Sequence, residues 1–262
     1  MRVDSIPIWL FFLGTALIVL VSLHAGWWLG RSARRRSEDE NEGPVSGISG
    51  AVLGLTAFML VFTFSIVAER YDARKALVRE DANAIRTTYL RSSFLPEPDQ
   101  TETKVLIGQY LESRLEFVRA DGAAPLDKVR LETDRIQRRL WQIAVSNAEK
   151  DMNSDVAALY VESLNNVFEI NASRVALGVQ ARIPDAVWLV LYTLTVLGMI
   201  AMGYHAGVAS KKWSKSTLLL ALSFTMMNTV IAYLDRPGST HVTQQPLMDV
   251  QAFILAENTR PE

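Results

Sequence analysis

The side chains with the clearest chemical potential lie on one face of the apolar stretch 47–68 and just beyond it. Phe58, Phe62, Ser65 and Glu69 recur every three or four residues, so an α-helix places them on one face. If several copies surrounded an axis with this face inward, two rings of phenylalanine would form an apolar constriction, followed by hydroxyl and carboxylate rings. Such a constriction can gate ions by dewetting. The alternative is that both phenylalanines face lipid or a neighbouring helix.

Small and polar residues within the apolar stretches predict contacts between helices. Small side chains at spacings of three and four allow transmembrane helices to approach closely, and a buried amide can hydrogen-bond to a neighbouring helix. We therefore expect helix-packing roles for Gly47, Gly50, Ala51, Gly54 and Asn228.

Other kinds of chemistry have no matching motif. The chain contains no cysteine and three histidines far apart in sequence, so we expect no metal site. None of the sequence motifs GxSxG, HExxH, the P-loop or the glycine-rich dinucleotide turn occurs, which predicts no enzyme, no catalytic residue and no cofactor. Lys and Arg number 27 against 28 Asp and Glu, a balance that argues against nucleic acid as a partner.

Four apolar stretches indicate a protein that crosses a lipid bilayer. They run over residues 8–30, 47–68, 186–207 and 216–234, and about 20 apolar residues suffice for one span. The first stretch is too long for the apolar region of a cleaved signal peptide, and its basic cluster follows it, so we expect it to be retained. The predicted fold class is all-α: a four-helix transmembrane protein with two hairpins, residues 1–68 and 184–236.

The segment between the second and third spans predicts a helical bundle outside the membrane. Residues 69–183 contain 17 basic and 18 acidic side chains. Residues 55–95 contain neither glycine nor proline, so an unbroken helix there would run roughly 60 Å. Apolar periodicity predicts further helices over 102–120, 126–150 and 154–182, separated by a turn at 120–125. The polar tail 237–262 has one amphipathic stretch, 247–256, and we expect it to dock on the bundle or on a neighbouring subunit.

Charges in the short loops predict the orientation. The loop 31–46 and the loop 209–216 are rich in arginine and lysine, and basic loops stay in the cytoplasm. The middle domain and both termini would then lie outside the cytoplasm. Arg70, Arg74 and the basic residues after them favour the opposite orientation.

Three segments resemble one family of bacterial four-span membrane proteins, the bestrophin-like family. They are LTAFMLVFTFSIVAERYDARKALVREDANAIRTTYLRSSFLPEP (55–98), RIPDAVW (182–188) and YLDRPGSTHVTQQPLMD (233–249), within a resemblance that covers about 47–249. The resemblance marks Asp235, Arg236, Gln244 and Pro246 as positions that family members share.

The resemblance implies a function and a location. Bestrophins are oligomeric anion channels whose second helix lines the pore, so Phe58 and Phe62 would form a neck and Arg70 and Arg74 would lie near the mouth. It implies a homo-oligomeric ion channel in the bacterial inner membrane. Bestrophins keep their middle domain in the cytoplasm, whereas the basic loops here predict that it lies outside the cytoplasm. In addition, no acidic cluster in this sequence resembles the calcium clasp of bestrophins. The alternative function is a non-conducting membrane sensor or scaffold whose helical bundle binds a partner protein.

Overall fold

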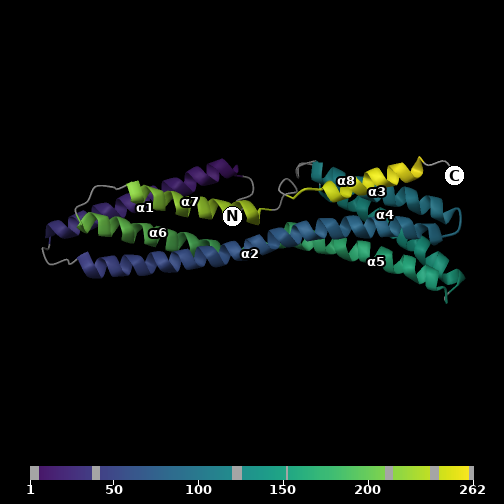
Figure 1. Ribbon diagram of the computed structural model, residues 1–262, viewed down its shortest axis with the longest axis horizontal. Helices are drawn as coiled ribbons and strands as arrows, with labels where there is room; N and C mark the ends of the chain where they lie inside the picture. Colours follow the sequence, from purple (N-terminus) through teal and green to yellow (C-terminus); the bar gives the residue numbers. More distant parts are fainter. Residues whose placement is uncertain are drawn as a thin grey trace. The chain divides into compact units, whose positions relative to one another are not determined.

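The computed structural model describes residues 6–36, 42–119, 126–151, 153–209, 215–236 and 242–259, and every regular element among them is helical (Figure 1). The chain divides into two compact units. The first unit combines the residues up to Tyr71 with Arg182–Arg236, and the second combines Asp72–Ala181 with Pro237–Glu262. The helix α2 (Glu42–Arg91) contributes residues to both units.

The first unit contains the helices that are long and apolar enough to cross a membrane. They are α1 (Ile8–Arg36), the first part of α2, α6 (Asp185–Val208) and α7 (Lys215–Asp235). This confirms the prediction of four apolar helices within an all-α fold. Their ends differ from the sequence prediction: α1 extends into the predicted loop 31–46 as far as Arg36, and α2 already begins within it at Glu42. Arginines at a helix C-terminus interact favourably with its dipole, which helps α1 extend past the apolar stretch. Residues 37–41 and 210–214, which belong to the two predicted basic loops, lie outside the described residues.

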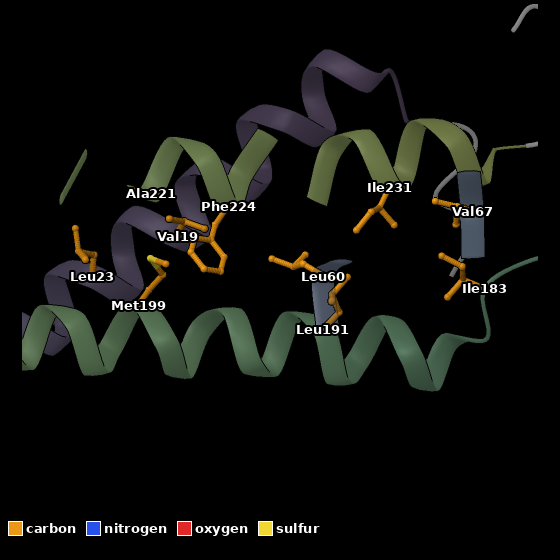
Figure 2. Close-up of a cluster of buried hydrophobic side chains, with 10 residues drawn as sticks. All are labelled: Val19, Leu23, Leu60, Val67, Ile183, Leu191, Met199, Ala221, Phe224 and Ile231. Carbon is orange, nitrogen blue, oxygen red and sulfur yellow. The ribbon is translucent and has the colours of Figure 1, made fainter. Parts of the chain in front are cut away.

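The core of the first unit is a cluster of apolar side chains drawn from all four helices (Figure 2). The outward faces of the same helices are equally apolar: Leu17 on α1 is 63% exposed and Leu219 on α7 is 64% exposed. A water-soluble domain rarely exposes so continuous an apolar surface. The buried cluster comprises Val19, Leu23, Leu60, Val67, Ile183, Leu191, Met199, Ala221, Phe224 and Ile231.

Helices α1 and α6 meet along a glycine seam formed by Gly26, Gly30, Gly203 and Gly207. A Cβ added to Gly26 would lie 2.8 Å from the Ile200 Cα atom, and one added to Gly203 would also meet backbone atoms of the opposite helix. The backbones therefore touch directly, which is the close approach that small residues at a spacing of four allow between transmembrane helices.

The second unit combines the second part of α2 with the remaining helices. These are α3 (Asp99–Arg119), α4 (Leu126–Lys150), α5 (Asp155–Val175) and α8 (Gln245–Asn258). The helix α4 packs against α3 and α5, and α3 also contacts α8. The helix α2 gives way to a 3-10 turn, η2 (Ser92–Phe94), just before Pro96, as the proline positions predicted.

Two helix boundaries in the second unit depart from the sequence prediction, the start of α3 and the end of α5. The helix α3 begins at Asp99 instead of residue 102, because acidic residues suit the first turn of a helix. The helix α5 is capped by Ser154, whose Oγ atom accepts a hydrogen bond from the Ala157 amide, and it passes into a π-helical turn, η3 (Ala176–Gln180), instead of continuing to residue 182. The predicted turn at 120–125 lies outside the described residues.

Candidate pore-lining face of the second helix

Three buried hydroxyl groups set the rotation of α2 in the first unit. Ser49, Thr56 and Thr63 follow one another at intervals of seven residues, so they lie on one face, and all three are buried. The Thr56 hydroxyl donates to the carbonyl oxygen of Leu194 on α6 at 3.1 Å, and the Ser49 hydroxyl donates to that of Ala201 at 2.9 Å. We call these three residues the hydroxyl row. The bonds from Ser49 and Thr56 to α6 hold this face of α2 inward, and the Thr63 hydroxyl donates within α2 to the Met59 carbonyl oxygen.

The opposite face of α2 carries the side chains that the sequence singled out for ion handling. Phe58 is 66% exposed and Phe62 is 57% exposed, and their rings stack with centroids 6.4 Å apart. Ser65 and Glu69 are exposed further along the same face. The structure therefore brings the four residues together on one surface, which the other described segments leave exposed.

The small residues of α2 continue this surface toward the N-terminal end of the helix. Gly47, Gly50, Ala51 and Gly54 are all exposed, and a Cβ added to any of the three glycines would meet no other atom within 4 Å. Within the chain the close helix contact lies instead at the glycine seam. The helix-packing role of these four residues therefore stays a prediction about contacts between copies. We call the whole surface the open face: Gly47, Gly50, Ala51, Gly54, Phe58, Phe62, Ser65 and Glu69.

Asp235 ties together three segments at one end of the first unit. Its Oδ1 atom accepts a hydrogen bond from the Ile183 amide at 3.0 Å and lies 3.9 Å from the guanidinium of Arg70. Its carbonyl oxygen accepts a hydrogen bond from Arg182 at 2.7 Å. The shared-motif residue Asp235 thus joins the end of α7 to α2 and to the chain that enters α6, and Arg70, the expected mouth residue, takes part in this junction.

Other predicted residues have different surroundings. Asn228 is fully buried in α7, and its Nδ2 atom donates to the Phe224 carbonyl oxygen of its own helix at 2.9 Å. Arg236 is half-buried directly after α7. Arg74 is half-buried in the part of α2 that belongs to the second unit.

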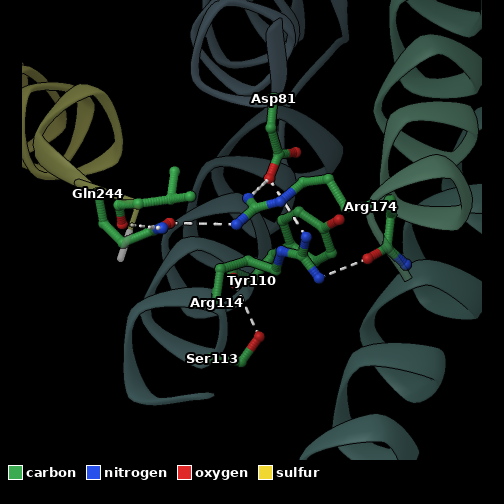
Figure 3. A network of polar contacts seen from close by, with 8 residues as sticks. Asp81, Tyr110, Ser113, Arg114, Arg174 and Gln244 are labelled. Atoms are coloured by element: carbon green, nitrogen blue, oxygen red, sulfur yellow. Dashed lines mark hydrogen bonds and ion pairs between the residues drawn. The ribbon is translucent and has the colours of Figure 1, made fainter. Parts of the chain in front are cut away.

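A buried ionic cluster in the second unit was not predicted (Figure 3). Asp81 on α2 is completely buried, and its Oδ2 atom accepts hydrogen bonds from Arg174 on α5 and from Arg114 on α3, the latter at 3.3 Å. Arg174 also donates to the Oε1 atom of Gln244 at 3.1 Å. Burial lowers the pKa of Arg174, and burial raises the pKa of Tyr110, which lies beside the cluster, to about 12.

The cluster includes the shared-motif residue Gln244, and the shared-motif residue Pro246 lies just after it at the start of α8. Gln244 precedes α8 and donates from Nε2 to the Val242 carbonyl oxygen, and Pro246 occupies the first turn of α8, where its missing N–H costs no hydrogen bond. Asp81 looks like any other charge in a region of mixed charge, so only its place between apolar Val78, Ala82 and Ile85 could have indicated burial.

The described residues contain no group of three His, Asp or Glu side chains placed to hold a metal ion.

A family model for the Bestrophin-like domain matches residues 16–247. The chain belongs to the bestrophin-like family. Together with its four apolar helices, this makes it a multi-pass membrane protein.

Solved structures share the fold of this bestrophin-like chain. A bacterial bestrophin homologue from Klebsiella pneumoniae, carrying one substitution, has a TM-score of 0.66 at 13% sequence identity and covers 97% of this chain and 99% of its own. A crystal structure described only as a membrane protein, also with one substitution, has a TM-score of 0.63 at 14% identity, with the same coverage. No curated protein matches the chain. At these identities the likeness shows the fold alone.

Proposed function

We propose that this bestrophin-like chain assembles into a ring of identical copies and forms an ion channel, with the open face of α2 lining the pathway. The observation that carries the proposal is the composition of that face. It is exposed along its whole length, yet it changes from small residues to aromatic rings and then to a hydroxyl and a carboxylate.

A surface that only faces lipid has a different composition. The outward side of α1, for example, presents Leu13, Leu17 and Val21, all more than half exposed. The hydroxyl of Ser65 gains nothing from hydrocarbon, and neither does the carboxylate of Glu69, which lies at the edge of the apolar stretch where a charge favours water over lipid. This contrast favours a water-filled pathway over a lipid contact for the open face of α2.

The order of residues suggests how the pathway would work. The small residues from Gly47 to Gly54 would leave a wide entrance, and the rings of Phe58 and Phe62 would form the narrow apolar section, where water and ions are excluded unless it widens. We expect anions to be the permeating ions because the family resemblance points to them. Arg70 and Arg74 supply positive charge close to Glu69 in the sequence.

The same proposal assigns the second unit, built from Asp72–Ala181 and Pro237–Glu262, to one side of the membrane. The short basic loops favour the cytoplasm, which would place the second unit on the opposite, extracytoplasmic side. A cysteine introduced at the exposed position Ser146 would be unique, because the native chain has none. Labelling by a membrane-impermeant maleimide on intact cells supports this side. Labelling only after permeabilisation would place the unit in the cytoplasm.

Halide flux into liposomes that contain the purified protein tests the channel. We expect flux above that of empty liposomes, and a higher rate for Phe62→Ala because the smaller side chain widens the apolar section. Leu17→Ala is the matched control, since Leu17 is equally exposed but lies on α1. A Phe62→Ala variant with the flux of the control would remove the assignment of this face. An assembled protein that conducts nothing would favour the sensor or scaffold function, to which the unbroken α2 shared by both units is equally suited.

A further inference from the structure

One side of α1 forms an aromatic and basic strip at the end where the helix leaves the apolar stretch. Its buried side, with Gly26 and Gly30, packs on α6. The strip on the other side consists of Trp28, Arg31 and Arg35, which follow one another at helical spacing and are all exposed. This strip faces the surroundings of the first unit and not its core.

The tryptophans of α1 fix the depth of this strip in a bilayer. Trp9 and Trp28 are both 62% exposed and lie 19 residues apart, which is about 28 Å along an α-helix. That length matches the roughly 30 Å thickness of the hydrocarbon core, and tryptophan concentrates at both of its interfaces. With Trp28 at one interface, the arginines that follow it lie in the layer of lipid headgroups.

Two contacts hold arginine side chains at that level. The guanidinium of Arg31 lies over the ring of Trp27, 5.1 Å from its centroid, and Arg34 donates a hydrogen bond to the carbonyl oxygen of Val208, the last residue of α6. Arg35 and Arg36 complete the final turn and are exposed. The helix α1 contains four arginines here and no acidic residue.

We propose that this strip binds the headgroup of an anionic phospholipid. Arg31 and Arg35 would contact the phosphate oxygens, because the guanidinium presents paired N–H donors that match them. Trp28 would pack against the glycerol and upper acyl chain. The site requires the chain to sit in a bilayer, but it is independent of ion conduction, so a failed flux experiment leaves it standing.

Thermal unfolding of the purified full chain in detergent micelles tests the site. We expect phosphatidylglycerol to raise the unfolding temperature at least twice as much as phosphatidylcholine does, and soluble glycerol phosphate to have no effect. The double variant Arg31→Gln, Arg35→Gln should reduce the phosphatidylglycerol shift to that of phosphatidylcholine. The matched control Arg130→Gln, Arg138→Gln removes two exposed arginines of α4 and should keep the full shift.

A measurement on the native chain tests the same inference without any substitution. Molar salt should abolish the difference between the two lipids, because screening weakens contacts between exposed charges. Equal shifts for the two lipids at low salt would overturn the proposal and would indicate that the acidic residues 38–40, which follow in sequence, neutralise the arginines. An undiminished shift in the double variant would also overturn it.

Discussion

Replacing Gly26 by alanine should destabilise the first unit far more than one methyl group ordinarily does. The added Cβ would lie 2.8 Å from both the Cα and the carbonyl carbon of Ile200 and closer still to the carbonyl oxygen. Carbon atoms in contact prefer separations of about 3.5–4.0 Å. The two helices would have to separate by about 1 Å, and every other contact along the glycine seam would loosen with them. Overpacking of this kind costs about 1–3 kcal/mol, and the backbone contact puts Gly26→Ala near the upper end.

The control for this prediction lies on the same helix. A Cβ added to Gly14 meets nothing within 4 Å, so Gly14→Ala should leave stability unchanged or raise it slightly through the better helix propensity of alanine. The free energy of unfolding is measured by reversible denaturation in mixed micelles of mild detergent and dodecyl sulfate. If Gly26→Ala costs no more than Gly14→Ala, the backbones of α1 and α6 do not meet as described.

Two further predictions concern the second unit. Asp81→Asn removes a completely buried carboxylate from two guanidinium groups whose side chains are only 12% and 14% exposed, and it should cost about 3–5 kcal/mol in thermal unfolding, while the exposed neighbour Glu80→Gln changes little. The hydrogen bond from Arg139 holds the pKa of Glu102 below its ordinary value of 4.5. A lowered pKa in the folded state adds stability that is present above pH 4.5 and is lost as the pH falls through the lower value. Glu102→Gln should therefore reduce the loss of stability as the pH falls below 4.5, and identical acid profiles for this variant and the native chain would contradict the ion pair.

The apolar helices could be predicted from the sequence because their lengths and composition leave few alternatives. The predicted helix 126–150 coincides with α4 because its apolar residues recur with a strong helical period. The ends of α1 and α2 could not be predicted from the sequence, because arginine and glutamate favour a helix as readily as a loop. Whether a residue at a helix end is helical depends on local competition between helix and loop conformations, which hydropathy does not measure.

The sites show a similar division. Helical spacing correctly grouped Phe58 with Phe62, because that depends on one helix alone. The hydroxyl row at residues 49, 56 and 63 could have been found from its spacing of seven, but which face of α2 meets α6 depends on both helices. Close approach was expected at the glycines of α2 and occurs in this chain between α1 and α6. Small residues at a spacing of four occur on both α1 and α2. Which of the two makes a close contact within the chain depends on whether another helix packs against that face.

The glycine seam also constrains how the chain can be made. A Cβ added to Gly207 would lie 3.1 Å from the Gly30 Cα atom, yet these two glycines lie almost 180 residues apart in sequence. At synthesis rates of about 5–20 residues per second, α1 leaves the ribosome roughly 9–36 s before its partner exists. During that interval α1 must persist in lipid without α6, which it can do because its backbone hydrogen bonds are internal. Insertion and helix pairing are therefore separate events in the biogenesis of this protein, and the second cannot begin until α6 has been translated.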